Sequence, residues 1–225
     1  MPAGRWPHPP ADQDRRQRTE EEVDPVDDPR ALGQLLLRRA RPRSYRREDG
    51  PADPRAATRI RSFQALLIPG LLQTPDYARY RALEVVRVYG TDPAQVDATV
   101  TARMRRQEVL YDSGKQFDFI ITEGALRILL CPPAVMRAQL DRLTTVIGLP
   151  NISLGIIPFG AELPVVPLVG YFMADDVTIV ETYTSEDTLS GEESAKYAEI
   201  TDGLMAESIT GDEARDLITR VAASL

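Results

Sequence analysis

The chain has 225 residues, 43% of them hydrophobic, and a formal net charge of −7, which suits one domain of middling size with its own core. Residues 1–60 carry 13 arginines against 11 acidic residues, so the rest of the chain has a net charge of −9 and lacks the basic face that nucleic-acid binding needs. Its apolar stretches fall short of the roughly 20 residues that cross a bilayer and no signal segment opens it, so we expect a cytoplasmic protein without membrane association.

Cysteine and histidine usage excludes several kinds of chemistry. Cys131 is the only cysteine, which rules out an internal disulfide and a zinc ribbon. His8 is the only histidine and precedes the predicted folded part, so neither a Ser-His-Asp triad nor a histidine-bound metal is expected there. No Gly-rich phosphate loop or dinucleotide fingerprint is present. We therefore expect any activity to need no cofactor and no metal.

Residues 1–57 read as a mostly disordered leader rich in proline and arginine. Nine of the 18 prolines fall in the first 60 residues, and a basic cluster runs from Arg38 to Arg47. Such a composition buries too little apolar surface to offset the entropy of ordering. The exception is a short helix predicted for the leucine-rich run at residues 32–37. The prolines that follow leave no room for a helix-turn-helix, so we expect the leader to contain no DNA-binding domain of that kind.

Strand and helix signals alternate from residue 58 onward. Thr74 with Pro75, and Asp92 with Pro93, each place a capping residue before a proline at the first helical position. In chain order we predict a strand at 58–68, helices at 74–88 and 92–110, a strand at 117–122, a helix at 133–148, strands at 152–158, 170–174 and 177–183, and helices at 192–208 and 211–223. The pair Asp175 and Asp176 is typical of a hairpin turn.

Grouped strands with helices at both ends indicate an α+β fold. We predict a small, largely antiparallel sheet flanked by helices, with an apolar pocket between sheet and helices. Residues 58–225 would form this single effector or ligand-binding domain.

Six blocks of sequence, in order, carry a family resemblance. They are LLIPGLLQTPDYAR (66–79), VTARMRRQEVLYD (100–112), FDFIITEGALR (117–127), VMRAQLDRL (135–143), PNISLGIIPFG (150–160) and TIVETYT (178–184). In these blocks the chain resembles the C-terminal effector domain of Scr-type, toxin–antitoxin-system antitoxin-like transcriptional regulators of the XRE class. The resemblance covers about residues 58–223. It implies a domain of regulator ancestry that senses a ligand or a small partner protein.

Two carboxylates continue apolar strand faces and are the candidates for chemistry. Side chains alternate across a strand, so Glu181 and Tyr183 share a face with Val177 and Ile179. The same count aligns Glu123 with the aromatic face of 117–122. A carboxylate in such a place is either paired or raised in pKa, as general acid–base chemistry requires. We take Glu181 and Tyr183 as the catalytic candidates, because Glu123 could simply complement the dipole of a following helix.

The helix at 92–110 supplies a possible cationic partner. Arg103 and Gln107 fall near the middle of its apolar stripe, and a buried guanidinium needs an anion. We predict that Arg103 pairs with Glu123 or Glu181 and that Gln107 satisfies a neighbouring polar group. An Arg–Glu pair that only stabilises the fold is the competing interpretation. The remaining pocket candidates are Gln73, Phe119, Phe159, Tyr171 and Met173. The apolar loop AELPVVPLV (161–169) could form a lid over the pocket, and an ordinary packed surface loop is an equally compatible interpretation.

Two functions fit these residues. In one, the domain binds an apolar small molecule and acts as a cofactor-free tailoring enzyme of secondary metabolism, promoting dehydration, addition or cyclisation by acid–base groups and positioning. In the other, it is an antitoxin-like regulatory module that binds a small partner protein or a ligand, and a homodimer is a further alternative. The absent reading head and the apolar loop favour the enzyme, whereas the resemblance favours the regulator.

Overall fold

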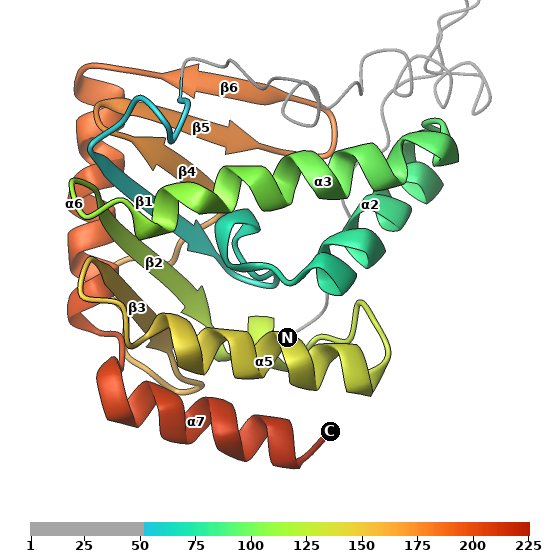
Figure 1. Cartoon of the computed structure of the whole chain (residues 1–225). Coiled ribbons are helices and arrows are strands. Elements are labelled where there is room, and N and C mark those ends of the chain that lie inside the picture. Colours follow the sequence, from blue (N-terminus) through green and yellow to red (C-terminus); the bar gives the residue numbers. More distant parts are fainter. Residues whose placement is uncertain (1–51) are drawn as a thin grey trace, which may run out of the picture. The chain divides into compact units, whose positions relative to one another are not determined.

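The computed structural model describes residues 52–225, which build one six-stranded sheet with helices on both faces (Figure 1). The strand order across the sheet is β3-β2-β1-β4-β5-β6. Their bounds are β1 Arg59–Gln64, β2 Gln116–Thr122, β3 Ile152–Ile157, β4 Tyr171–Ala174, β5 Val177–Glu181 and β6 Glu186–Leu189. The predicted leader helix at residues 32–37 lies outside the described residues.

The sheet is mixed, and strand β1 divides it into two halves. On one side β1 pairs parallel with β2, and β2 pairs parallel with β3. On the other side β1 pairs antiparallel with β4, and β5 and β6 follow as hairpins. We call these the parallel half (β1–β3) and the antiparallel half (β4–β6). The predicted α+β class is confirmed, with three antiparallel and two parallel pairings.

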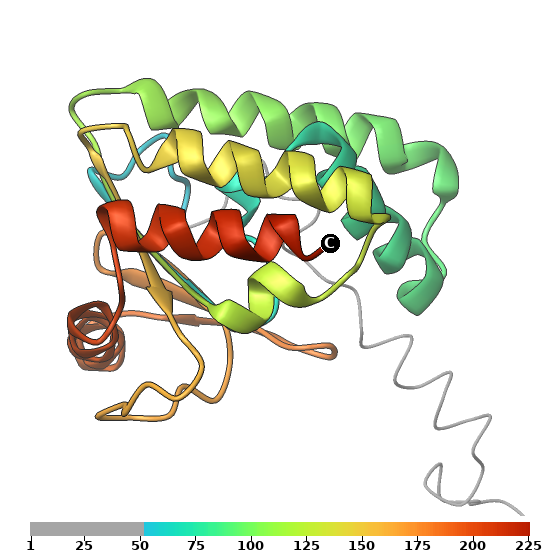
Figure 2. The ribbon, with the colours of Figure 1, turned by 90° about the horizontal axis from the view of Figure 1, so that it is seen from below.

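Six α-helices cover the sheet. Their bounds are α2 Pro75–Tyr89, α3 Val96–Arg106, α4 Glu123–Arg127, α5 Pro133–Val146, α6 Glu192–Ala206 and α7 Gly211–Ala223, with short 3₁₀ segments η2 Gly70–Leu72, η3 Pro93–Gln95 and η4 Gln107–Tyr111. Helices α2, α3, α5 and α7 lie on one face, and α6 lies on the other (Figure 2). We call these the front and back faces.

The capping signals place the first helices where the sequence predicts. The Thr74 hydroxyl accepts from the Tyr77 N–H at 3.3 Å, and Pro75 begins α2. Helix α2 ends at Gly90, whose φ of 63° suits a residue without a side chain. The Asp92 carboxylate caps η3 by accepting from the Ala94 N–H at 2.9 Å, and α3 follows directly. These two turns bring α3 back along α2, so that the helices form a pair.

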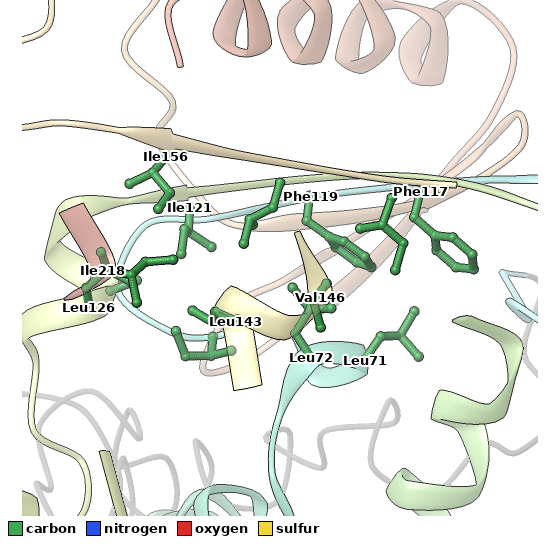
Figure 3. Packing of buried hydrophobic residues seen from close by; sticks show 14 of the residues in the cluster. Leu71, Leu72, Phe117, Phe119, Ile121, Leu126, Leu143, Val146, Ile156 and Ile218 are labelled. Atoms are coloured by element: carbon green, nitrogen blue, oxygen red, sulfur yellow. The ribbon is translucent and has the colours of Figure 1, made fainter. Parts of the chain in front are cut away.

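The front face of the parallel half is a closed apolar core. The side chains of Phe117, Phe119 and Ile121 point from β2 toward Leu143 on α5 and Leu72 on η2 (Figure 3). All five are fully buried. Burial of a leucine or phenylalanine side chain contributes about 1.5–3 kcal/mol, so this layer supplies a large share of the stability.

Helix α6 closes the back face at the middle of the sheet. Tyr171 packs edge-on against Tyr197 with 4.9 Å between ring centroids, and its hydroxyl lies 2.9 Å from that of Thr201. Burial raises the pKa of the Tyr171 phenol. The end of α6 then passes so close to β3 that a Cβ added at Gly155 would meet Met205 Sδ at 2.8 Å. A side chain is therefore excluded at Gly155 by the helix above it.

A buried arginine joins the back of the sheet to α6. Arg61 on β1 lies between two carboxylates, with Nη2 3.0 Å from Asp202 Oδ1 on α6 and Nε 3.4 Å from Asp118 Oδ2 on β2. Its Nη1 also donates to the Ala198 carbonyl at 3.1 Å. Because these partners come from α6 and β2, the guanidinium on β1 fixes α6 relative to both strands.

Most predicted elements are confirmed within one to four residues of their ends. Two elements escape the prediction: strand β6, whose sequence EDTL lacks an apolar alternation, and helix α4, which is only one turn long. The expected extension of β1 to residue 68 is wrong, because the strand ends at Gln64 and the chain turns into η2. Asp175 does occupy the β4–β5 turn, with φ of 50°.

Candidate functional site

A cleft of about 910 Å³ opens on the front face of the antiparallel half. Its floor is the sheet, where Phe172 and Ile179 face each other across the β4–β5 pair and Glu181 and Glu186 face each other across the β5–β6 pair. One wall is the α2–α3 pair, which contributes five residues of α2 between Arg81 and Tyr89, together with Arg103 and Arg106 of α3. The cleft thus lies beside the closed core, over a part of the sheet that helices α5 and α7 do not cover.

The cleft exists because helices cover only part of the front face. Helix α7 contacts β3 and helix α5 contacts α7, so this layer stays over the parallel half. Helices α2 and α3 pack their apolar faces against each other and bury Ala78, Ala82 and Val100 between them. Ile179 therefore remains half-buried, and Phe172 stays half-buried at the edge of the core that it packs against. An apolar strand face without a covering helix is the physical origin of the cavity.

Apolar side chains from three loops form the rim. Leu66 follows β1, Leu129 follows α4 and Leu168 precedes β4, and all three line the cleft while remaining exposed. Leu168 is 92% exposed and Leu129 is 50% exposed, so this rim presents an apolar surface to solvent. The predicted lid loop contributes only Leu168 and Val169 to the lining.

Polar and aromatic side chains gather at the other end of the cleft. Arg81 and Glu84 on α2 form an ion pair at 2.6 Å, and Tyr89 ends the same helix. Burial raises the pKa of Tyr89, and the charge of Glu181 raises it further. We call the region lined by Arg81, Glu84, Tyr89, Glu181 and Tyr183 the polar end.

The two catalytic candidates both line the polar end. Glu181 is the last residue of β5 and is exposed. Tyr183 lies beyond the strand, in a turn where the Thr182 hydroxyl accepts from the Ser185 N–H at 3.0 Å. Tyr183 is 73% exposed, so its phenol is open to solvent as well as to the cleft. The arrangement can hydrogen-bond a ligand, but it leaves both groups in contact with water.

The predicted ion pair between Arg103 and Glu123 is not formed. Arg103 lines the cleft, and its Nη1 donates to Gln73 Oε1 at 2.5 Å. Gln73 is buried and in turn donates to the Ile68 carbonyl. Gln107 donates to the carbonyls of Gly70 and Gln73, as its predicted role of satisfying polar neighbours requires. Gln73 and Gln107 therefore hold η2 against α3 behind the cleft wall.

Glu123 instead belongs to the structural frame. It begins α4, accepts from Arg127 Nη2 at 2.6 Å and from the Phe159 N–H at 2.9 Å, and does not line the cleft. Burial would raise the pKa of Glu123, but these two donors outweigh it and hold the pKa below its ordinary value. Phe159 is exposed, with its ring 5.9 Å from the Arg127 guanidinium. Neither Glu123 nor Phe159 approaches Glu181.

The aromatic and sulfur candidates divide between the two faces. Phe119 lines the cleft from the front face. Tyr171 contributes to the lining, but its ring packs on the back face against Phe63 at 5.8 Å. Met173 also packs on the back face, under Thr201 of α6.

The sequence prediction missed the α2 side of the cleft. Arg81, Glu84, Val85, Val88 and Tyr89 all line it, at spacings of three, four, seven and eight residues. That spacing is one face of a helix and could have been read from the sequence. It was hidden because the stripe mixes charged and apolar side chains, whereas a buried helix face is uniformly apolar.

Residues 52–225 contain no group of three or more His, Cys, Asp or Glu side chains arranged to hold a metal ion. Within the same range, no helix has the length and apolar character needed to span a membrane.

Comparison with known proteins identifies a family for this chain. Residues 54–220 match the family model described as a domain of unknown function, DUF5753. No curated protein and no solved structure matches the chain.

Proposed function

We propose that this chain, which belongs to the DUF5753 family, binds a small molecule with an apolar body in the front cleft. The observation that carries the proposal is the cavity itself, whose volume of about 910 Å³ falls in the range of small-molecule sites, roughly 300–1,000 Å³. A cytoplasmic location fits a domain of this kind.

The lining of the cleft supports an elongated, mostly apolar ligand. Leu66, Leu129 and Phe119 lie along one part of it, and Phe172 and Ile179 form the floor. Each Å² of apolar surface removed from water is worth about 25 cal/mol. A ligand that covers the exposed Leu66 and Leu129 and the half-buried Ile179 therefore gains affinity without directional contacts. Polar groups then set its orientation. Arg103 on the α3 wall and Glu181 with Tyr183 at the polar end are the side chains we assign to that role.

Acid–base catalysis is a second candidate, favoured by the grouping of Glu181, Tyr183 and Tyr89 at one end of the cavity. A carboxylate and phenols there could move a proton on a ligand whose apolar body is held against the floor. Dehydration, addition or ring closure of a secondary metabolite would need no cofactor. Both candidate groups are open to water, however, so binding is the function that the geometry supports more strongly.

A regulatory role would use the same cleft to sense its ligand. The resemblance to antitoxin-like regulators favours this role, in which the apolar rim would bind a small partner protein or a second copy of the chain. Leu168, Val166 and Phe159 are exposed apolar side chains on the loop before β4 and would supply that surface.

The test uses Nile red, a neutral apolar fluorescent probe. We expect the purified chain to bind it saturably at one site. Leu129→Arg places a charge on the apolar rim and should weaken binding at least about tenfold, since burying an unpaired charge is costly. The matched control is Val166→Arg, an exposed apolar position that does not line the cleft.

The control variant should bind Nile red as the natural chain does. Equal loss in both variants, or binding that never saturates, would exclude the cleft as the site. For the catalytic candidate, Glu181→Gln should keep Nile red binding and abolish conversion in a metabolite profile of the producing strain. A profile that Glu181→Gln leaves unchanged would exclude catalysis and leave the binding role intact.

A further inference from the structure

Gln64, the last residue of β1, brings a neutral amide into the front cleft. Its side chain lines the cleft and is partly buried. Ser62 also lines the cleft from the same strand face, but its hydroxyl already donates to the Tyr171 carbonyl at 3.1 Å. Within residues 52–225 the Gln64 amide has no hydrogen-bond partner, and its polar atoms are not sealed from solvent. Gln64 therefore offers the cleft both a donor and an acceptor.

Gly170 gives this amide its place. In the β1–β4 pair Phe63 faces Tyr171, so the next positions along the two strands are Gln64 and Gly170. A Cβ added at Gly170 would meet Gln64 Oε1 at 2.8 Å and Gln64 Cδ and Nε2 at 3.0 Å. Because these three atoms are nearly equidistant, the plane of the amide lies flat over Gly170. Donor and acceptor directions run in that plane, so this packing leaves them available.

The backbone does not require a glycine at this position. Positive φ angles occur at other glycines of the described chain, such as Gly90 and Gly160, but not at Gly170. An alanine could adopt the same backbone conformation at residue 170. The contact with Gln64 is therefore what excludes a side chain there, unless the amide moves away.

The charged side chains of the cleft nearly balance one another. Among the described lining residues, three arginines stand against four acidic residues: Arg81, Arg103 and Arg106, and Asp53, Glu84, Glu181 and Glu186. Arg81 pairs with Glu84 at 2.6 Å, and Asp53 pairs with Arg55 at 2.9 Å. An ionic group on a ligand would meet charges of both signs and would lose its hydration, whereas a neutral group avoids that cost. The cleft therefore favours a ligand without a net charge.

We propose that Gln64 recognises a neutral amide on the ligand whose N–H and C=O lie on one edge, as in a primary amide, a lactam or an imide. This inference rests on the ligand-binding function proposed above. Gln64 Nε2 donates to the ligand carbonyl and Gln64 Oε1 accepts from the ligand N–H, which closes a pair of antiparallel hydrogen bonds. Gly170 is a positioning residue, because it acts only by holding the Gln64 amide in place. A ligand without the N–H leaves Oε1 unpaired and is disfavoured.

The first test compares octanamide with N,N-dimethyloctanamide as competitors of Nile red. The two compounds share the acyl chain and the carbonyl, but only octanamide has N–H donors. We expect the natural chain to bind octanamide at least about fivefold more tightly, because the dimethyl compound leaves an acceptor unpaired. The preference is a ratio within one variant, so a change in Nile red affinity cancels. Equal affinity of the natural chain for both compounds would overturn the proposal.

Gln64→Met keeps the length of the side chain and removes both hydrogen-bonding groups. It should reduce the preference for octanamide to less than about twofold. The matched control is Gln116→Met, an exposed strand glutamine on β2 that does not line the cleft, and it should keep the full preference. A preference that survives Gln64→Met, or that falls equally in both variants, would contradict recognition by Gln64.

Gly170→Ala tests the positioning role. The new methyl group would occupy the space of the amide, but it meets only the end of a flexible side chain, so the melting temperature should change little. The preference for octanamide should nevertheless fall below about twofold, because the amide is displaced. Gly203→Ala in α6, outside the cleft, should leave the preference intact. A full preference in Gly170→Ala would show that Gly170 does not position the amide.

Side-chain amide signals in nuclear magnetic resonance measure the contact without Nile red. The signals of Gln64, assigned by their absence in Gln64→Met, should shift when octanamide is added, and those of Gln116 should not. If octanamide shifts the backbone signal of Ile179 but not the Gln64 signals, amide recognition is wrong and the ligand proposal stands. If octanamide shifts none of these signals and Nile red does not bind saturably, the cleft is not a ligand site and both proposals fall.

Discussion

The two halves of the front face use the same sheet in opposite ways. Over the parallel half, α5 and α7 bury Phe117, Phe119 and Ile121 completely. Over the antiparallel half, Phe172 and Ile179 stay half-buried because the nearest helices, α2 and α3, use their apolar sides on each other. A strand face that helices cover becomes core and contributes to stability, whereas an equally apolar face without a covering helix is left as a binding surface. The position of the helices, rather than the composition of the strands, decides between the two.

Alanine substitutions in the two halves should differ most in their cost to the free energy of unfolding. Leu143→Ala in the parallel half should cost about 2–5 kcal/mol of unfolding free energy, because it leaves a cavity in a closed layer. Ile179→Ala on the cleft floor should cost about 1–2 kcal/mol, because water already reaches that side chain. Urea unfolding measures both, and equal losses would mean that the cleft floor is packed as tightly as the core.

Two glycines on the back face can be compared: Gly155 on β3, which lies under α6, and Gly203, which lies within α6. Gly155→Ala should cost about 1–3 kcal/mol, because the new methyl group would meet Met205 Sδ and Ser208 Cβ at 2.8 Å. Gly203→Ala in α6 meets only Pro164 at 3.4 Å and should be neutral or stabilise by about 0.4–1 kcal/mol. The melting temperature of Gly155→Ala should therefore fall, whereas that of Gly203→Ala should stay the same or rise. An equal change in both melting temperatures would contradict the close packing of α6 on β3.

The contacts of Glu123 should make the stability of the chain depend on pH. Glu123→Gln should cost about 1–2 kcal/mol at pH 7, a value reduced because Arg127 is partly exposed. The pKa of Glu123 is lowered from 4.5 in the folded chain, so its contribution is complete above about pH 4.5 and disappears as pH falls through the folded pKa. The stability difference between the variant and the natural chain should therefore close in acid. A difference that is constant from pH 7 to 3 would show that the charge is not responsible.

The smallest effect on stability should come from the rim. Leu129→Ala should change the unfolding free energy by less than about 0.5 kcal/mol, because the side chain is half exposed. It should nevertheless weaken Nile red binding severalfold. A large loss of stability would mean that the rim is part of the core and not a binding surface.

Sequence reasoning predicted the elements of this fold better than their assembly. Thr74 with Pro75, and Asp92 with Pro93, mark helix starts by local chemistry, and the structure confirms both. Strand β6 has no such mark, because an edge strand facing water needs no apolar alternation. The parallel pairing of β1 with β2 depends on a crossover of about 50 residues, and no local pattern encodes it.

For the candidate site, the sequence predicted which side chains share the β5 face but not which charged groups pair with each other. Alternation in β5 correctly placed Val177, Ile179 and Glu181 together. It could not show that Glu123 would find Arg127 one helical turn away and leave Arg103 to Gln73. Partner choice among charged groups depends on distances between elements, which a one-dimensional pattern does not contain.

The central place of β1 also governs how this domain is made. Its neighbours β2 and β4 begin 52 and 107 residues after its own end. At a translation rate of about 5–20 residues per second, roughly 5–20 seconds pass before β4 leaves the ribosome. During that time β1 waits with an unpaired edge and with Ile60 and Phe63 uncovered, which makes the nascent chain a natural client for chaperones. Rapid expression at high temperature should therefore favour inclusion bodies, and slower synthesis in the cold should favour soluble protein.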